Sequence, residues 1–254
     1  MLVELRERLV TQGVSQQEIK AQGDRLAHEY LMRELAAHRP DDGVLSEEGS
    51  GTDGPSGTRR LGMQRVWIVD PLDGTREFGE YPRTDWAVHV ALVIDGRPVV
   101  GAVALPAQGV VLSTGGSAGS GAAGGAVDGL AGAAGLAGVP AVPRVLVSRS
   151  RPPAIAKWIA DCLGGELVEM GSAGAKAAAV VQGQAEVYPH AGGQYEWDSC
   201  APVAVALGSG YVATRLDGSE LVYNNADPYL PDLLVCHPDL HARVRAAIES
   251  FPDS

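Results

Sequence analysis

The chain has 254 residues, of which 45% are hydrophobic and 20% are charged, and its formal net charge is −11. This length allows one domain, or two packed domains, with a substantial buried core. The negative charge argues against a nucleic acid polymer as partner, because no basic stripe is available to displace counterions from a phosphate backbone. No signal peptide is recognisable and no apolar run approaches the ~18 residues of a membrane span, so we expect a soluble, cytoplasmic protein without a membrane partner.

The first two predicted elements are helices. Residues 1–10 carry leucines at helical spacing, and a second helix is expected from Asp24 to His38, followed by Pro40. Asp24 is expected at the N-cap of this second helix. Its carboxylate could serve capping alone, or it could point from the helix start into a functional site, and the pattern leaves both readings open.

A short apolar strand is predicted next, at Val44 and Leu45, and it ends in the adjacent carboxylates Glu47 and Glu48. Two neighbouring like charges are costly in a dry site unless a cation lies beside them. On an exposed loop the same pair would be unremarkable. Residues 49–65 are rich in Gly, Ser, Thr and Arg and are expected to form a surface loop.

The segment from Val66 to Thr75 contains several of the candidate functional residues. An apolar run ends in Asp70, is expected to turn at Pro71, presents Asp73, and continues into a Gly-Thr pair that can open a helix. This order predicts a strand that delivers two acidic ligands to a metal and places backbone N–H groups near a phosphate. A simple Asx-turn between two elements is the alternative.

Two antiparallel strands follow, at 85–94 and 98–105, joined by a hairpin at Asp95-Gly96. His89 lies in the strand interior and is expected to be a packed residue, not a ligand. Residues 113–138 are mostly Gly and Ala and cannot bury enough apolar area to fix a fold. We therefore expect a flexible loop there, at the boundary of an α+β metal- and phosphate-binding domain, residues 1–140.

The second half alternates strands and helices, which indicates an α/β domain over residues 141–254 on the substrate side. Strands are predicted at 144–148 and 167–170, and each is followed by a helix. Asp198 begins a helix of small residues, where it could be a cap or a metal ligand. Short strands at 211–214 and 221–223 are expected to flank a turn, and the chain ends in an amphipathic helix at 240–251.

Four acidic points thus fall at the ends of predicted elements: Asp24, Glu47, the Asp70/Asp73 pair, and Asp198. Together they form the oxygen ligand set that two or more hard cations prefer. The three cysteines are far apart, and no His or Cys cluster competes for a softer metal. Carboxylates combined with a Gly-Thr helix start indicate phosphoryl chemistry.

The ordered motifs D…EE…DPLDGT…WDxxAP, at Asp24, 47–48, 70–75 and 197–202, resemble the inositol monophosphatase and fructose-1,6-bisphosphatase superfamily. The wider sequence is similar to 3′-phosphoadenosine 5′-phosphate phosphatases of the actinobacterial CysQ type. This resemblance implies a layered α-β-α-β-α sandwich, lithium-sensitive catalysis with two or three Mg²⁺ per site, and a role in sulfur assimilation. It also implies release of AMP from a small phosphorylated substrate, and a homodimer.

The resemblance also implies roles for individual residues. Expected metal ligands are Glu47, Asp70, the Leu72 carbonyl, Asp73 and Asp198. Asp24 and Thr75 match the pair that orients and deprotonates the attacking water, and the amides of Gly74 and Thr75 would hold the phosphate. Substrate contacts are expected from Arg151, Gly171, Ser172 and Lys176, although the GSAGAK segment is one residue longer than the common GSSLK form.

Two other functions fit the same sequence. The first is a phosphatase of similar chemistry that acts on inositol 1-phosphate, fructose 1,6-bisphosphate or a sugar phosphate of a specialised pathway. The second is a non-catalytic nucleotide or phosphate sensor. A substrate comparison in the presence of Mg²⁺ separates all three.

Overall fold

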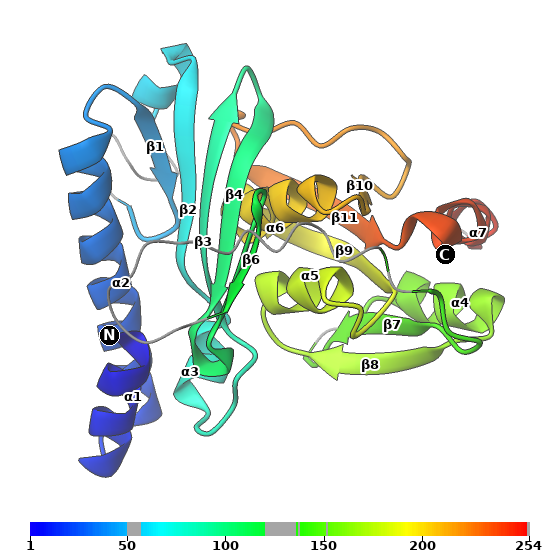
Figure 1. The fold of residues 1–254 in the computed structure, drawn as a ribbon, viewed down its shortest axis with the longest axis horizontal. Helices are drawn as coiled ribbons and strands as arrows, with labels where there is room; N and C mark the ends of the chain where they lie inside the picture. Colours follow the sequence, from blue (N-terminus) through cyan, green and yellow to red (C-terminus); the bar gives the residue numbers. More distant parts are fainter. Residues whose placement is uncertain (50–56, 120–135, 137, 151, 253–254) are drawn as a thin grey trace.

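Two β-sheets form the frame of the protein (Figure 1), which the computed structural model describes at residues 1–49, 57–119, 136, 138–150 and 152–252. The first sheet has the strand order β1-β2-β3-β4-β5-β6, and the second has the order β10-β11-β9-β7-β8. In the first sheet β1 is parallel to β2 and the remaining neighbours are antiparallel. In the second sheet β7 is parallel to β8 and β9, whereas β11 is antiparallel to β9 and β10.

The strands of the first sheet are β1 (Gly43–Ser46), β2 (Arg65–Asp73), β3 (Ala87–Ile94), β4 (Arg97–Leu105), β5 (Val110–Ser113) and β6 (Gly116–Gly119). Those of the second are β7 (Arg144–Ser148), β8 (Glu166–Met170), β9 (Val187–Tyr195), β10 (Val212–Thr214) and β11 (Tyr229–Cys236). The helices are α1 (Leu2–Thr11), α2 (Gln16–His38), α3 (Thr75–Gly79), α4 (Ala154–Leu163), α5 (Ala173–Val181), α6 (Glu196–Gly208) and α7 (Pro238–Glu249). Short 3-10 turns lie at Arg59–Gly62 and Pro106–Gln108.

The helices and sheets stack in five layers, which confirms the predicted α-β-α-β-α sandwich. Helices α1 and α2 cover the outer face of the first sheet, α5 and α6 lie between the sheets, and α4 and α7 cover the far side of the second sheet (Figure 1). The largest apolar cluster joins α5 and α6 to both sheets. No helix in the described part of the chain combines the length and apolar character of a membrane span.

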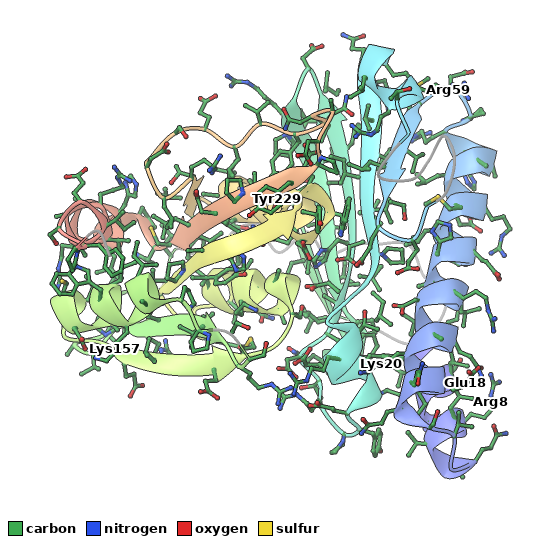
Figure 2. All side chains as sticks on the ribbon, turned by 180° about the vertical axis from the view of Figure 1, so that it is seen from behind. Arg8, Glu18, Lys20, Arg59, Lys157 and Tyr229 are labelled. Atoms are coloured by element: carbon green, nitrogen blue, oxygen red, sulfur yellow. The ribbon has the colours of Figure 1, made fainter. Side chains whose placement is uncertain are left out.

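Charged side chains mark the outer face of the first helical layer. Arg8 and Glu18 project away from the sheet in Figure 2, whereas the buried residues of α1 are Leu2, Leu5 and Leu9 together with Arg6. This division of polar and apolar faces is the expected consequence of helical periodicity. It fixes α1 against α2 and α3 and so holds one flank of the site.

The N-terminal boundary predicted for the second helix is wrong. Helix α2 begins at Gln16, where the Ser15 side chain accepts a hydrogen bond from the Glu18 N–H, so Asp24 lies within the helix and not at its N-cap. Gly23 is buried, and a Cβ at this position would come within 2.6 Å of the Phe78 ring. The glycine permits close packing of α2 on α3 and does not mark a helix start.

The turn predicted at Pro71 is also wrong, because β2 continues to Asp73. Its pairing with β3 shifts register between Asp70 and Asp73. In a regular strand, residues three apart face opposite sides, and a bulge corrects this by one position. The irregularity therefore lets both carboxylates reach the same place.

Other differences concern loops. Residues 116–119 form β6 where a loop was predicted, while residues 120–135 and 137 of the Gly/Ala-rich segment, and residues 50–56 of the earlier loop, lie outside the described residues. Residues 221–223 form no strand, and β10 pairs instead with β11, which was not predicted. The first sheet comes from residues before position 140 and the second from residues after it, but the division into two domains stays a prediction.

Candidate active site

Three carboxylates converge where β2 ends and α6 begins. Oxygen atoms of Asp70, Asp73 and Asp198 all lie within 4.8 Å of one another. Strand β2 delivers the first two residues, and the third lies in the first turn of α6. Residues separated by more than a hundred positions thus form one acidic cluster.

Asp70 is the most deeply buried member, with 1% of its surface exposed. Its Oδ1 accepts a hydrogen bond of 3.0 Å from the Leu72 N–H, whereas its buried Oδ2 has no hydrogen-bond partner among the described residues. Burial, and then the charge of Asp73, raise the pKa of Asp70 well above its ordinary value. A dry, unpartnered carboxylate oxygen is costly unless a cation lies beside it.

Asp73 lies in a more favourable environment. It accepts hydrogen bonds from the Ser172 hydroxyl and from the backbone N–H groups of Ala173 and Gly174. Burial alone would raise its pKa, but contact with His89, together with these donors, lowers the pKa of Asp73 to about 2. The N-terminal end of α5 thereby holds one carboxylate of the cluster in its charged form.

Buried His89 lies beside these two carboxylates. Its Nε2 is 3.3 Å from Asp73, its Nδ1 is 3.9 Å from Asp70, and Nδ1 lies 3.1 Å from the Trp197 carbonyl oxygen. Burial opposes protonation, but Asp73 raises the pKa of His89. The expectation of a packed residue is right about burial, although it missed this contact, which follows from the pairing of Asp70 with His89 between β2 and β3.

Asp198 and Glu47 complete the acidic side. The Tyr195 N–H donates a 2.6 Å hydrogen bond to Asp198, whose pKa is raised to about 6 by burial and by Asp73. Glu47 follows β1 at the solvent edge, outside the tightest group of three. Partial removal from water, and then Asp198, raise the pKa of Glu47 to about 7.

The donor set fits hard divalent cations. Burial, and then the negative charges of the neighbouring carboxylates, raise the pKa values of Asp70, Asp198 and Glu47, and one buried oxygen of Asp70 has no hydrogen-bond partner among the described residues. Oxygen ligands of this kind suit Mg²⁺, Ca²⁺ or Mn²⁺ better than softer metals. The cluster is therefore a candidate metal centre.

Asp24 and Thr75 lie next to each other although α2 and α3 are far apart in sequence. The Thr75 Oγ1 is 3.3 Å from Asp24 Oδ1 and 2.9 Å from the Leu72 carbonyl oxygen. The hydroxyl has one proton and can donate it fully to only one of these acceptors. Burial, and then the charge of Glu48, raise the pKa of Asp24 to about 6.

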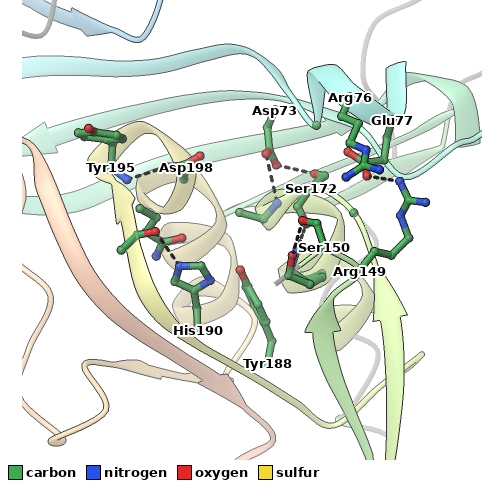
Figure 3. Close-up of a pocket in the computed structure, with 17 residues that line it drawn as sticks. Asp73, Arg76, Glu77, Arg149, Ser150, Ser172, Tyr188, His190, Tyr195 and Asp198 are labelled. Carbon is green, nitrogen blue, oxygen red and sulfur yellow. Dashed lines mark hydrogen bonds and ion pairs between the residues drawn. The ribbon is translucent and has the colours of Figure 1, made fainter. Parts of the chain in front are cut away.

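A cavity of about 610 Å³ opens beside the acidic cluster (Figure 3). Side chains from α3, the end of β7, α5 and β9 surround it, and Figure 3 shows Asp73 and Ser172 facing it opposite Tyr195 and Asp198. Its lining residues are Asp73, Gly74, Arg76, Glu77, Ser148, Arg149, Ser150, Gly171, Ser172, Ala173, Lys176, Tyr188, His190, Gly193, Gln194, Tyr195 and Asp198.

Most of the predicted substrate contacts border this cavity. Gly74 has a φ of +80°, and a Cβ there would lie 2.9 Å from Ser172. Gly171 donates its N–H to Asp85, and a Cβ at this position would lie 2.3 Å from Glu77. Both glycines are thus needed for α3 and the turn before α5 to approach each other.

Lys176 and Arg151 are the two cations predicted to contact the substrate, and Lys176 borders the cavity. Lys176 is buried, and its Nζ donates to the Ser172 carbonyl oxygen at 2.6 Å, so its ammonium group faces the backbone turn. Burial lowers the pKa of Lys176, although Asp73 opposes this effect. Arg151 lies outside the described residues, and Arg149 lines the cavity.

Arg149 and Arg76 were not singled out from the sequence. The Arg149 guanidinium contacts Glu77 and Glu80 at 2.8 Å each, and Arg76 contacts Glu80 at 3.0 Å. The Ser-Arg-Ser-Arg run contained the signal for a basic residue at the exit of β7. It could not indicate which arginine faces the cavity, because the strand ends at Ser148 and the direction of each later side chain depends on the loop.

Comparisons with known proteins give a consistent family. The model of the inositol monophosphatase family matches residues 3–251. A 3′-phosphoadenosine 5′-phosphate phosphatase of Mycobacterium tuberculosis is 48% identical over 236 residues, covering 89% of this chain and 80% of that protein. The 3′(2′),5′-bisphosphate nucleotidase CysQ of Escherichia coli is 33% identical over 208 residues, covering 82% of this chain and 80% of that protein.

A solved structure agrees with these sequence matches. The crystal structure of CysQ from Bacteroides thetaiotaomicron superposes with a TM-score of 0.70 at 30% sequence identity. The match covers 84% of this chain and 83% of the other.

Proposed function

The chain belongs to the inositol monophosphatase family of metal-dependent phosphatases, and we propose that it hydrolyses 3′-phosphoadenosine 5′-phosphate to AMP and inorganic phosphate. The 48% identity to a phosphatase named for that substrate, extending over 89% of the chain, carries this proposal. The acidic cluster beside a cavity large enough for a small phosphorylated molecule supports it.

We propose Mg²⁺ as the metal, two or three ions per site, held by Glu47, Asp70, Asp73, Asp198 and the Leu72 carbonyl. When bound, such cations supply a more acidic water molecule and neutralise charge on the phosphate and the leaving oxygen. The Leu72 carbonyl already accepts the Thr75 hydroxyl, and its second lone pair leaves room for another partner.

The Asp24–Thr75 pair is suited to positioning and deprotonating the attacking water. A carboxylate with a pKa of about 6 is largely ionised at neutral pH and still basic enough to accept a proton. The Thr75 hydroxyl donates to the Leu72 carbonyl and can direct its own lone pairs toward the water. We assign general-base assistance to Asp24 and orientation to Thr75, worth roughly 10²–10⁴-fold in rate.

The phosphate would lie against the backbone amides of Gly74 and Thr75, where β2 passes into α3. Arg149 and Arg76 border the same cavity and supply positive charge at its rim. Gly171, Ser172 and Lys176 form the facing turn, in which Ser172 is bonded to Asp73 and Lys176 braces the turn from within. We infer a contact with substrate for Gly171 and Ser172, and a supporting role for Lys176.

The experiment is a comparison of kcat/KM for 3′-phosphoadenosine 5′-phosphate, inositol 1-phosphate and fructose 1,6-bisphosphate, with Mg²⁺ and with a chelator. We expect Mg²⁺-dependent release of phosphate and at least a tenfold preference for the nucleotide, which corresponds to about 1.4 kcal/mol in transition-state binding. A comparable preference for a sugar phosphate would refute the nucleotide assignment. Tight nucleotide binding without hydrolysis would instead indicate a sensor.

A further inference from the structure

Gln194 is a buried polar side chain with no role in the site described so far. Only 6% of it is exposed, and neither its Nε2 nor its Oε1 has a hydrogen-bond partner among the described residues. It lines the cavity beside the acidic cluster. The Tyr188 hydroxyl borders the same cavity and is likewise buried without a partner there.

An amide in this position needs an explanation, because buried polar groups in native proteins are almost always hydrogen-bonded. Leu or Met would fill the same space without leaving a donor and an acceptor unpaired. Packing alone therefore does not explain why this position is a glutamine. A ligand that enters the cavity and forms hydrogen bonds with the amide would explain it.

The backbone holds Gln194 in a defined place. Gly192 and Gly193 precede it with φ values of +122° and +84°, and a Cβ on Gly193 would come within 2.4 Å of the Tyr229 hydroxyl. The next residue, Tyr195, donates its N–H to Asp198. Gln194 and Tyr195 are therefore adjacent in β9: one carries the unpaired amide, and the other holds Asp198 through its backbone N–H.

An aromatic pair lies next to this amide. The Tyr195 ring stacks on Trp197 with a centroid distance of 4.6 Å and an interplanar angle of 8°, and Tyr195 is 45% exposed. Figure 3 shows Tyr195 beside Asp198 on one wall of the cavity, with Tyr188 and His190 on the same side of it. Tyr195 lines the same cavity as Gln194, and an aromatic side chain can stack on a planar heterocycle.

Building on the proposed function, we propose that Gln194 recognises the nucleobase of the substrate and thereby determines specificity for adenine. A glutamine amide presents a donor and an acceptor side by side, which match the N6 amino group and the N7 atom of adenine. On that edge hypoxanthine presents two acceptors, O6 and N7, and cannot make the same pair. A sugar or inositol phosphate has no such planar edge.

The test uses the near-isosteric substitution Gln194→Met. We measure kcat/KM in Mg²⁺ for 3′-phosphoadenosine 5′-phosphate and for its hypoxanthine counterpart, and AMP affinity by calorimetry. We expect the unsubstituted protein to prefer adenine by roughly 10- to 100-fold, as for a good bidentate contact. The substitution should remove most of this preference through KM and weaken AMP binding similarly, while kcat changes little.

A matched control is Gln184→Met, which replaces an exposed glutamine whose amide contacts Gln182 at 3.2 Å away from the cavity. This control should change neither the preference for adenine over hypoxanthine nor the affinity for AMP. An unchanged adenine preference and AMP affinity in Gln194→Met would overturn the proposal. Unfolding of this variant would also count against it, because an amide without a structural partner should be dispensable for folding. If the unsubstituted protein does not hydrolyse 3′-phosphoadenosine 5′-phosphate at all, the proposed function fails, and AMP affinity still tests Gln194.

Discussion

The two sides of the cavity handle charge in opposite ways. On the acidic side, burial and neighbouring carboxylates raise the pKa values of Asp70, Asp198 and Glu47, and one buried oxygen of Asp70 has no hydrogen-bond partner among the described residues. On the basic side, Arg149 is bound by two glutamates and Lys176 by a backbone carbonyl. The uncompensated carboxylates indicate that a cation binds on the acidic side. Arg149 and Lys176 already have partners in the protein, so their main role is structural and their effect on substrate binding is smaller.

The largest expected effect is on the acidic side. Replacing Asp70 with Asn should reduce Mg²⁺-dependent turnover by more than the ~10⁴-fold that a single acid–base group supplies, because a metal ligand and its charge are both lost. Thermal unfolding in a chelator should show an unchanged or higher midpoint, since a destabilising like charge is removed. The exposed Asp161→Asn change is the control. A folded Asp70→Asn protein with normal activity would contradict the assignment.

A smaller effect is expected on the basic side. The change Arg149→Ala removes positive charge from the cavity rim and leaves the Glu77 carboxylate without its arginine, whereas Glu80 keeps Arg76, so a phosphate should bind more weakly. We expect KM to rise about tenfold, about 1.4 kcal/mol, with a much smaller change in kcat. Stability should fall by about 1 kcal/mol, the upper end for a partly exposed ion pair.

The control for that change is Arg97→Ala, which breaks an exposed 2.9 Å ion pair with Glu220 far from the acidic cluster. It should alter stability by less than ~0.5 kcal/mol and leave KM unchanged. If Arg149→Ala lowered kcat while KM stayed the same, the basic side would take part in the chemistry, and the contrast between the two sides would fail.

A further expected effect is a pH dependence of stability without metal. Asp24, Asp198 and Glu47 have folded-state pKa values of about 6, 6 and 7, above their ordinary values of 3.8, 3.8 and 4.5. The folded state therefore binds more protons than the unfolded state between about pH 4 and 7, and stability should fall as pH rises through this window. Asp73, with a pKa of about 2, acts oppositely and loses its contribution only as pH falls below about 4.

Calorimetry in the presence of a chelator should show a lower unfolding midpoint at pH 7 than at pH 5. The midpoint should fall by roughly 2–4 °C for each kcal/mol lost from the free energy of unfolding. Added Mg²⁺ should raise the pH 7 midpoint more than the pH 5 midpoint, because cations and protons compete for the same carboxylates. A midpoint that rises from pH 5 to 7 in the chelator would show that the carboxylates do not repel one another in the folded protein.

The same contrast explains what could be predicted from sequence. The acidic side is largely encoded in one short segment, DPLDGT, where strand, carboxylates and helix start are consecutive. The facing wall, with Arg149 after β7, Lys176 in α5 and Gln194 in β9, is assembled from separate elements, so its members become neighbours only through the fold. Local patterns gave no way to identify Arg149 as a lining residue, to see that Lys176 faces a backbone carbonyl, or to find Gln194.

The prediction of the fold failed at residues whose role depends on contacts between elements, because these residues were interpreted as signals for a local turn or helix start. Asp24 was interpreted as the N-cap of a helix, but it lies inside α2, and the glycine before it, Gly23, is the point where α2 meets Phe78. Pro71 was interpreted as a turn, but it lies in a strand whose irregular pairing with β3 carries the chain onward. The layered architecture was predictable because apolar periodicity and the family resemblance do not depend on such contacts.

Gly174 limits how this protein can be engineered. A Cβ at this position would lie 1.9 Å from His89 Nε2, and the Gly174 N–H donates to Asp73. Exchanging helical glycine for alanine commonly stabilises a protein, by about 1 kcal/mol in helix propensity. Here it would push α5 away from β3 and pull apart residues of both halves of the site. Consensus or library designs that aim at thermostability should therefore leave position 174 unchanged and draw their substitutions from the outer helices.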